Sequence, residues 1–301
     1  MRLRVAALAT VLLAGCAATQ APPPAPAQPA PERTAAVSER APGPPPGMQW
    51  LYGSGEGGVA SLQTYYAFRD HVLAAARRRP DDSVVLAEGS TIDEPRFVAC
   101  GDKPLAVVLD VDETAIQNLG YEYALARSGR ASDSALLDRW QRAPRTEIAA
   151  MPGAVTALRA VREAGVAVIF NSNRDAPDAA ATAATLENAG LGPVRHGDTL
   201  FLRGDVDGDG GKDGRRAHIA SRYCVVAMAG DQLGDFSDLF NVRGLSVPDR
   251  RRAATGGPFA RLWGNGWFML SNPVYGPSLR GGFDDVFSPD RQWAEPQDGR
   301  D

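Results

Sequence analysis

Two aspartates separated by one residue follow a continuous apolar run near the middle of the chain. Residues 105–109 are all apolar, and Asp110 and Asp112 come directly after them. Carboxylates in such a pair can bind a divalent cation, attack an electrophile or exchange a proton with a substrate. A solvated turn or a helix N-cap uses the same residue types. The pair therefore indicates chemistry only if other reactive residues lie beside it.

Two other apolar runs also end at polar residues. They cover residues 166–170 and 224–229, and shorter apolar runs cover 200–202 and 267–270. The residues after the two longer runs that can bind phosphate or metal are Ser172, Asn173, Asp231 and Asp235. Short apolar runs of this kind are typical of strands that are buried on both faces of a parallel sheet.

Helical patterns alternate with the predicted strands. One helix is expected over residues 55–79, a second carries Val155, Leu158 and Val161 on one face, and a third spans 177–189. This alternation predicts an α/β fold with a doubly wound, Rossmann-like parallel sheet. The active site of such a fold lies beyond the carboxyl ends of its strands, where the polar residues above are expected to meet.

Lysine is scarce, so the position of each lysine is informative. Lys103 and Lys212 are the two lysines of the chain. Lys103 precedes the first predicted strand and so lies at the end of the sheet away from the expected active site, which makes Lys212 the preferred candidate for a lysine in that site. The segment 205–210 resembles the start of a calcium-binding loop. However, Lys212 and Arg216 stand where that loop needs an apolar residue and a glutamate.

The first residues resemble a bacterial lipoprotein signal. Arg2 and Arg4 precede an apolar run over residues 5–13, which is too short to span a membrane as a stable helix. The run leads into Leu-Ala-Gly-Cys, a sequence similar to a lipobox. We therefore expect residues 1–15 to be removed and Cys16 to be lipidated.

The residues after Cys16 predict the membrane to which the protein is sorted and a tether before its folded part. Ala17, rather than an aspartate, favours sorting to the outer membrane. Ten of the 23 prolines fall in residues 17–47, which predicts a disordered tether.

The net charge is −4 without a block of like charge, so no nucleic-acid polymer is expected as a partner. Nothing in the sequence predicts an oligomeric state.

Four motifs in the correct order resemble those of the haloacid dehalogenase superfamily. The first motif, Asp-x-Asp-x-Thr, matches residues 110–114, and the others match Ser172, Lys212 and the Gly-Asp-x-x-Gly-Asp segment at 230–235. The resemblance implies that Asp110 attacks phosphorus and forms an aspartyl-phosphate. An aspartate at the second position of the first motif implies a phosphatase rather than a transport ATPase.

The resemblance also implies the other roles in the site. Asp112 would protonate the leaving alkoxide and later activate water. Ser172, the backbone amide of Asn173 and Lys212 would bind phosphoryl oxygens. A cation would be needed because carboxylates repel a phosphate dianion. The implied ligands of a Mg²⁺ ion are the side chains of Asp110 and Asp231 and the backbone carbonyl of Asp112. Asp235 would bind the ion through water or orient Asp231.

Further segments are similar to the class C acid phosphatases, bacterial outer-membrane lipoproteins related to plant vegetative storage proteins. The resemblance covers about residues 48–285. It rests on the lipobox, an N-terminal helical cover, the Trp140 region leading to Met151-Pro152-Gly153-Ala154, Ser172-Asn173-Arg174, and Ser271-Asn272-Pro273-x-Tyr275-Gly276. It implies the sheet order 5-4-1-2-3, which makes the strands that precede Asp110 and Asp231 neighbours.

Two cysteines remain after Cys16. Cys100 and Cys224 can form a disulfide in an oxidising compartment, and two buried thiols are the alternative. The implied sheet order places both near the amino ends of neighbouring strands. A Cys100–Cys224 disulfide is therefore a hypothesis that follows from the resemblance.

The implied function is that of a Mg²⁺-dependent acid phosphatase for phosphomonoesters, with nucleoside 5′-monophosphates as the expected substrates. Two alternatives stay open: a surface lipoprotein that binds nucleotides or a partner without turnover, and a phosphotransferase that uses an alcohol as acceptor. Membrane attachment is expected through the lipid on Cys16, at the outer membrane, on its periplasmic or cell-surface face. Aromatic residues that could stack on a base are Tyr65, Tyr66, Tyr121, Tyr123, Trp140 and Tyr275.

The predicted organisation has five parts. An insertion at about residues 115–150 is expected to form a cap that covers the site. The parts are a signal peptide over 1–15, a tether over 16–47, a helical cover over 48–100, a phosphatase core over 101–290 and a tail over 291–301.

Overall fold

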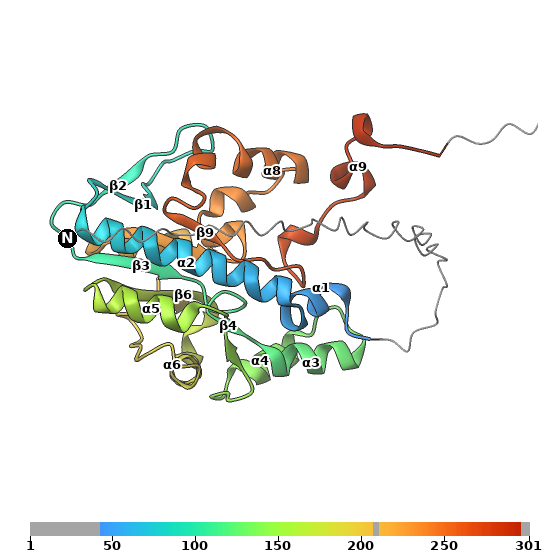
Figure 1. Ribbon diagram of the computed structural model, residues 1–301, viewed down its shortest axis with the longest axis horizontal. Helices are drawn as coiled ribbons and strands as arrows, with labels where there is room; N and C mark the ends of the chain where they lie inside the picture. The colour runs from blue at the N-terminus through green and yellow to red at the C-terminus, as the bar shows by residue number, and fades with distance from the viewer. Residues whose placement is uncertain (1–42, 207–210, 296–301) are drawn as a thin grey trace, which may run out of the picture. The chain divides into compact units, whose positions relative to one another are not determined.

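A five-stranded parallel sheet forms the centre of the computed structural model, which describes residues 43–206 and 211–295 (Figure 1). Each neighbouring pair in this sheet is parallel. In the order of pairing the strands are β7 (Leu200–Arg203), β6 (Ala167–Asp175), β3 (Leu105–Leu109), β8 (Cys224–Gly230) and β9 (Trp267–Met269). The predicted sheet order and the doubly wound α/β fold are confirmed.

Helices surround the sheet, and short turns connect many of them. The helices are α1 (Pro46–Met48), α2 (Gly55–Arg77), α3 (Leu119–Ser128), α4 (Ser134–Gln141), α5 (Ala154–Glu163), α6 (Ala179–Asn188), α7 (Asp213–Arg222), α8 (Val247–Thr255) and α9 (Phe283–Val286). The turns are the π-helical η1 (Gln49–Gly53) and the 3-10 turns η2 (Ala176–Asp178), η3 (Leu233–Asp235), η4 (Asp238–Asn241), η5 (Gly257–Leu262), η6 (Pro277–Leu279) and η7 (Pro289–Arg291).

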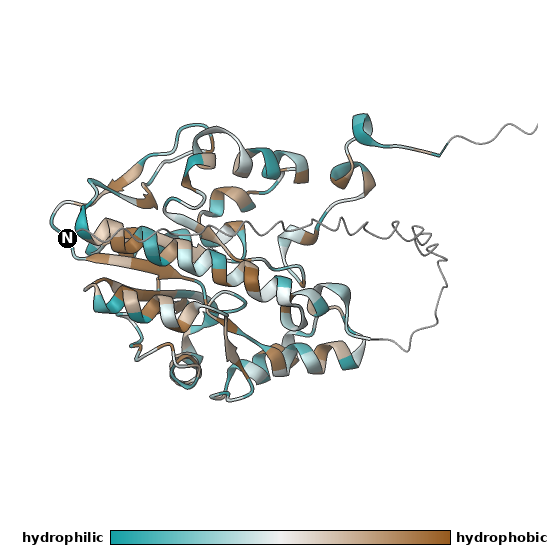
Figure 2. Cartoon of the chain, viewed as in Figure 1, coloured by the Kyte–Doolittle hydropathy of each residue, from teal (hydrophilic) through white to brown (hydrophobic). Residues whose placement is uncertain are grey.

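Alternate residues of β3 face two separate apolar cores. Val107 and Leu109 pack in a cluster with residues of α2, α5 and α6. Ala106 and Val108 pack in a second cluster, with residues of α7, α8 and η5. Since successive side chains of a strand point to opposite faces, a strand buried on both faces must be apolar at every position. The apolar colouring along β3 in Figure 2 follows from this burial.

The helix α5 buries two of the three residues that were predicted to share one apolar face. Val155 is 37% exposed, whereas Leu158 and Val161 are buried as expected. The buried face begins at Ala154 and continues through Ala157, at the spacing of one helical face, and Val155 lies about 100° around the helix from Ala154. The prediction for Val155 was wrong because small alanines, rather than the larger valine, face the core.

Two small antiparallel sheets are separate from the central sheet. The strands β1 (Asp82–Leu86) and β2 (Phe97–Ala99) pair within the predicted N-terminal cover, after α2. The strands β4 (Ile116–Gln117) and β5 (Ala149–Ala150) pair at the two ends of the segment that holds α3 and α4. This second pair closes the predicted cap insertion at its base.

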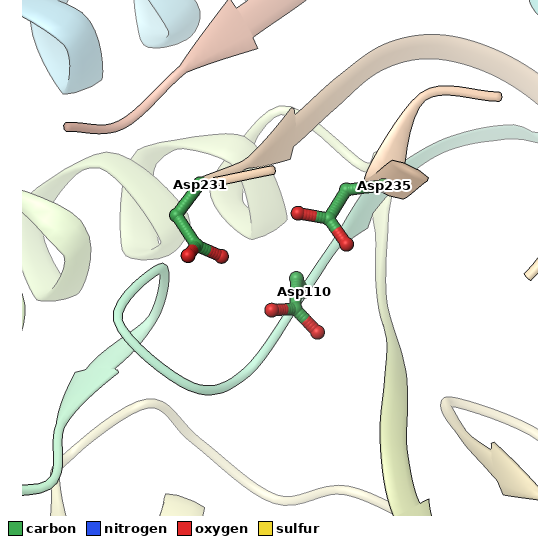
Figure 3. A group of neighbouring side chains, drawn as sticks. All are labelled: Asp110, Asp231 and Asp235. Carbon is green, nitrogen blue, oxygen red and sulfur yellow. The ribbon is translucent and has the colours of Figure 1, made fainter. Parts of the chain in front are cut away.

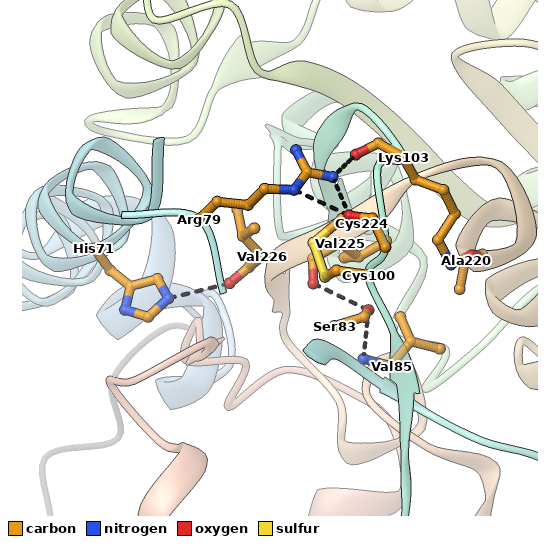
Figure 4. Close-up of a disulfide and its surroundings, with 11 residues drawn as sticks. His71, Arg79, Ser83, Val85, Cys100, Lys103, Ala220, Cys224, Val225 and Val226 are labelled. Carbon is orange, nitrogen blue, oxygen red and sulfur yellow. Dashed lines mark hydrogen bonds between the residues drawn. A yellow bond between two sulfur atoms is a disulfide. The ribbon is translucent and has the colours of Figure 1, made fainter. Parts of the chain in front are cut away.

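A disulfide joins Cys100 to Cys224, as the resemblance implied (Figure 4). Both residues are fully buried, and their Cα atoms lie 4.6 Å apart. Cys224 is the first residue of β8 and pairs with Leu105 of the neighbouring β3. The disulfide therefore lies at the amino end of these strands, opposite the carboxyl ends that carry the aspartates.

Removing this disulfide should destabilise the protein without altering the site. The two cysteines are 124 residues apart, and a disulfide that closes a long loop restricts the unfolded chain. We expect the Cys100→Ala/Cys224→Ala variant to lose about 2–5 kcal/mol of unfolding free energy. Urea unfolding monitored by circular dichroism measures this loss. An unchanged midpoint, or two free thiols in the unfolded, unreduced wild type, would show that the disulfide is absent.

Several predictions concern residues outside the described ranges. They are the signal peptide over 1–15, lipidation of Cys16, the tether as far as residue 42, residues 207–210 of the calcium-like loop and residues 296–301 of the tail. Across residues 43–206 and 211–295, no helix has both the length and the apolar character needed to cross a membrane.

Candidate active site

Three aspartate carboxylates meet at the carboxyl edge of the sheet. Asp110 directly follows β3, and Asp231 directly follows the neighbouring β8. The backbone N–H of Asp110 donates to the carbonyl of Ala229 at 3.0 Å, which holds the two strand ends together. With Asp235, the last residue of η3, each carboxylate offers an oxygen within 4.8 Å of those of the other two (Figure 3).

The loop from Asp231 to Asp235 needs a glycine before it. A Cβ atom at Gly230 would lie 2.3 Å from the Cβ of Asp235, so a side chain cannot fit there. The carboxylate of Asp235 accepts a hydrogen bond from the backbone N–H of Gln232 at 2.8 Å. The Gly-Asp-x-x-Gly-Asp segment thus folds Asp235 back toward the end of β8.

Lys212 lies among the aspartates, as predicted. It directly precedes α7, and its Nζ donates to Asp110 and, at 2.7 Å, to Oδ1 of Asp235. Asp238 accepts the backbone N–H of Lys212 at 3.1 Å and so fixes the start of α7. Burial disfavours the ammonium charge, but the carboxylates of Asp110 and Asp235 outweigh it and raise the pKa of Lys212.

The carboxylates repel one another inside the protein. Burial raises the pKa of Asp110 well above its ordinary value, and the three nearby aspartates add to this although Lys212 opposes it. Burial and the neighbouring Asp235 raise the pKa of Asp231 to about 7, although Asn272 and Gln232 donate hydrogen bonds to it. A single lysine thus compensates the negative charge only in part.

This donor set fits a divalent cation. It consists of carboxylate oxygens, the ligands that hard cations such as Mg²⁺ prefer. A divalent charge would also relieve the repulsion that raises the two pKa values. Asn272 donates to Asp231 at 2.7 Å and Thr114 donates to it at 3.2 Å, and these bonds orient the carboxylate.

The side chain of Asp112 belongs to a separate network, beside the cluster of three. Arg174 donates to it from Nη2 at 2.6 Å and from Nε at 3.1 Å, and Asn118 donates at 2.8 Å. Burial acts to raise the pKa of Asp112, but the charge and hydrogen bonds of Arg174, with the hydrogen bond of Asn118, lower it below the ordinary value. Arg174, 1% exposed, therefore fixes this carboxylate beside Asp110.

The two residues of β6 that were predicted to bind phosphate, Ser172 and Asn173, occupy different places. Asn173 lines the cavity described below, and its Oδ1 accepts a hydrogen bond from Arg215 at 2.8 Å. Ser172 is fully buried, and its Oγ accepts the backbone N–H of Arg174 at 3.1 Å. Ser172 is absent from the cavity wall, as far as the described residues define that wall. Its phosphate-binding role stays a prediction.

A cavity of about 1010 Å³ opens beyond the aspartates. Its inner end is formed by Asp110, Lys212, Asp231 and Asp235. Its outer wall comes from α3, α4, the N-terminal residues 45–48 and the segment 273–277. Of the six candidate stacking residues, Tyr121 and Tyr275 line it. A volume of this size accommodates a phosphate with a large leaving group.

Sequence reasoning missed Glu113, which ties three parts of the chain together. Its backbone φ of 53° is unusual for a residue other than glycine. The carboxylate accepts hydrogen bonds from Tyr52 at 3.2 Å, from the hydroxyl of Tyr275 and from the backbone N–H of Asn118 at 2.9 Å. Burial and the charge of Asp112 raise its pKa to about 7. No local pattern could reveal partners that lie so far away in the sequence.

Sequence reasoning also missed Glu122 on α3. Its side chain is 3% exposed and lines the cavity. Burial, with the charge of Asp112, raises its pKa to about 7. Its position on a cap helix of mixed composition gave no signal before the cavity was known.

The parallel sheet, the aspartates at its carboxyl edge and the capped cavity define a phosphohydrolase of the haloacid dehalogenase type. A model of the HAD superfamily, subfamily IIIB (Acid phosphatase), matches residues 69–278. The chain therefore belongs to this family, and it is a phosphomonoesterase. Membership sets aside the alternative of a protein that binds without turnover, and phosphatases of this superfamily typically use a divalent metal.

Two solved structures resemble the chain over most of its length. One is a class C acid phosphatase from Bacillus anthracis, 25% identical, with a TM-score of 0.61, covering 77% of this chain and 84% of the other. The second is a class C acid phosphatase from the same organism with tungstate bound, 22% identical, with a TM-score of 0.63 over 83% and 96% of the two chains. The second likeness shows the fold alone. A search of curated proteins found no significant match.

Proposed function

We propose that this acid phosphatase depends on Mg²⁺ and hydrolyses nucleoside 5′-monophosphates through an aspartyl-phosphate on Asp110. The observation that carries the proposal is the cluster of Asp110, Asp231, Asp235 and Lys212 at the inner end of a capped cavity. A nucleophilic carboxylate, cation ligands and a fixed ammonium are the parts that in-line phosphoryl transfer needs.

The proposed reaction has two steps, and residues of the chain take part in each. An oxygen of Asp110 attacks phosphorus, a P–O bond to Asp110 forms, and the ester P–O bond breaks. Asp112 gives the leaving alkoxide a proton. In the second step Asp112 takes a proton from water, whose oxygen attacks phosphorus and releases Asp110. Lys212 adds positive charge where the transition state spreads negative charge.

The cation would be held by Asp110 and Asp231, by the backbone carbonyl of Asp112 and, directly or through water, by Asp235. When bound, it supplies positive charge that lets a phosphate dianion approach the carboxylates. The ion pair with Arg174 supports the position of Asp112 and its part in the second step, because it holds the carboxylate, the form that can take a proton from water.

Attachment to the outer membrane is part of the proposal. The lipobox ending at Cys16 supports it, as does the proline-rich segment between that cysteine and the described residues. Such a segment is typical of a tether, and lipidation at its start would place the phosphatase beside the membrane.

Nucleotide preference follows from the aromatic residues in the cavity wall. Stacking of a base on an aromatic side chain contributes about 1–3 kcal/mol. We therefore expect kcat/KM for AMP to exceed that for ribose 5-phosphate by about tenfold or more, measured by phosphate release. The Tyr121→Leu variant should lose much of this difference.

The matched control is Tyr123→Leu. Tyr123 belongs to the same helix, but it is 68% exposed and is not among the described residues of the cavity wall. Its ratio of the two kcat/KM values should match that of the wild type. Equal kcat/KM for AMP and ribose 5-phosphate in the wild type would reject nucleotide preference. Transfer of phosphate to an added alcohol at the expense of water would instead identify a phosphotransferase.

A further inference from the structure

The cap contributes a buried carboxylate that the reaction above does not use. Glu122 lies on α3 and lines the cavity, yet its Oε2 is shielded from water and has no hydrogen-bond partner among the described residues. A buried polar group without a partner costs about 1–3 kcal/mol, and more when it is charged. A residue that served only to pack the cap would not need a carboxylate here.

The carboxylates near Glu122 make this cost larger. The charge of Asp112 disfavours ionisation of both Glu122 and Glu113, and the charge of Glu122 disfavours ionisation of Glu113. Tyr52 and Tyr275 donate hydrogen bonds to Glu113, but neither supplies a positive charge. This side of the cavity therefore gathers negative charge and tyrosine side chains.

Cations near this side of the cavity have other partners. Arg174 is bound to Asp112. Arg130, which lines the outer wall, pairs with Asp133. Among the described residues neither Glu113 nor Glu122 takes part in an ion pair, whereas the ammonium of Lys212 lies with the aspartates at the inner end. Two glutamates on the side of the cavity that would hold the leaving group thus have no ion-pair partner among the described residues.

We propose that Glu122, supported by Glu113, forms a subsite for a positively charged nitrogen on the leaving group of the substrate. This inference rests on the proposed function, because the phosphoryl end of the substrate must lie at Asp110 for its leaving group to reach the cap. An ammonium group in the cavity beside Glu122 would place a positive charge near both carboxylates and offset their negative charge. The same field would disfavour leaving groups that carry a second anionic group.

Two series of simple phosphate esters test the subsite. One series carries an ammonium at the end of an alkyl chain of about two to six carbons, and the other ends in a methyl group at the same position. At neutral pH we expect kcat/KM to favour the ammonium ester by about tenfold at the best chain length, which corresponds to about 1.4 kcal/mol. Hydroxyl-ended esters can donate a hydrogen bond but carry no charge, so their kcat/KM should exceed that of the methyl-ended esters by a smaller factor.

Two variants decide whether Glu122 is responsible. In Glu122→Gln, which keeps the shape and removes the charge, the ammonium-to-methyl ratio should fall to about one. In Glu147→Gln, which removes an exposed carboxylate of the same cap segment, the ratio should stay at the wild-type value.

The outcome distinguishes this subsite from the catalytic proposal. Hydrolysis of all esters with no preference for ammonium at any chain length would overturn the subsite and leave the catalytic proposal intact. A preference that persists in Glu122→Gln would overturn the role of Glu122. Hydrolysis of the methyl-ended esters by Asp110→Asn at the wild-type rate would instead contradict the proposed function.

Discussion

Replacing Asp110 with asparagine should lower kcat for phosphate release by at least about 10⁴-fold, because the amide cannot form the covalent intermediate. The side chain keeps its size, and the amide oxygen can still accept a hydrogen bond from Lys212. Burial already disfavours the charge of Asp110, so a neutral amide should not destabilise the fold. Phosphate release and thermal unfolding, measured on the same preparation, separate loss of chemistry from loss of structure.

Asp284→Asn is the matched control for this prediction. Asp284 is exposed on α9, outside the cavity wall as defined by the described residues, and its replacement should leave phosphate release unchanged. If Asp110→Asn retained more than about a tenth of wild-type kcat, Asp110 could not be the nucleophile.

Removing divalent metal should abolish phosphate release reversibly. Without a cation, three buried carboxylates face one phosphate dianion, and Lys212 alone cannot compensate their charge. Treatment with EDTA should reduce activity by at least about 10³-fold, and added Mg²⁺ should restore it. Binding to the folded state also stabilises it, so Mg²⁺ at about 100 times its Kd should add about 2.7 kcal/mol of unfolding free energy.

Calorimetry of Mg²⁺ binding gives a readout that does not depend on activity. We expect Asp231→Asn to bind Mg²⁺ at least tenfold more weakly, because it removes one carboxylate ligand. Asp138→Asn, an aspartate of the cap side of the cavity, should bind Mg²⁺ like the wild type. Full activity in EDTA together with no heat of binding would reject a metal site at this edge.

Much of the fold was predictable because the signals were local. The run over residues 105–109 became β3 with the same bounds, since a strand buried on both faces must be apolar throughout. The ends of such strands also indicated where Asp110, Asp231 and Asp235 would meet. Prediction of the sheet order and of the disulfide needed the family resemblance, because no single segment of the sequence determines which strands pair.

The rest of the site depended on contacts between distant parts of the chain. Arg174 was expected only as part of a motif, yet it holds Asp112 across 62 residues of sequence. Glu113 binds Tyr52 and Tyr275, and no periodicity or spacing relates residues so far apart. Burial of Glu122 in the cavity wall likewise became visible only when the cap was in place over the sheet.

Trapping the covalent intermediate is the most direct test of the catalytic proposal. Wild-type enzyme mixed with a phosphate ester and stopped in acid within milliseconds should carry an acid-stable, base-labile phosphoryl group. Mass spectrometry should place that group on the peptide containing Asp110, and the Asp110→Asn variant should show none. Phosphate found on another residue, or turnover with no phosphorylated enzyme at any time, would contradict nucleophilic attack by Asp110.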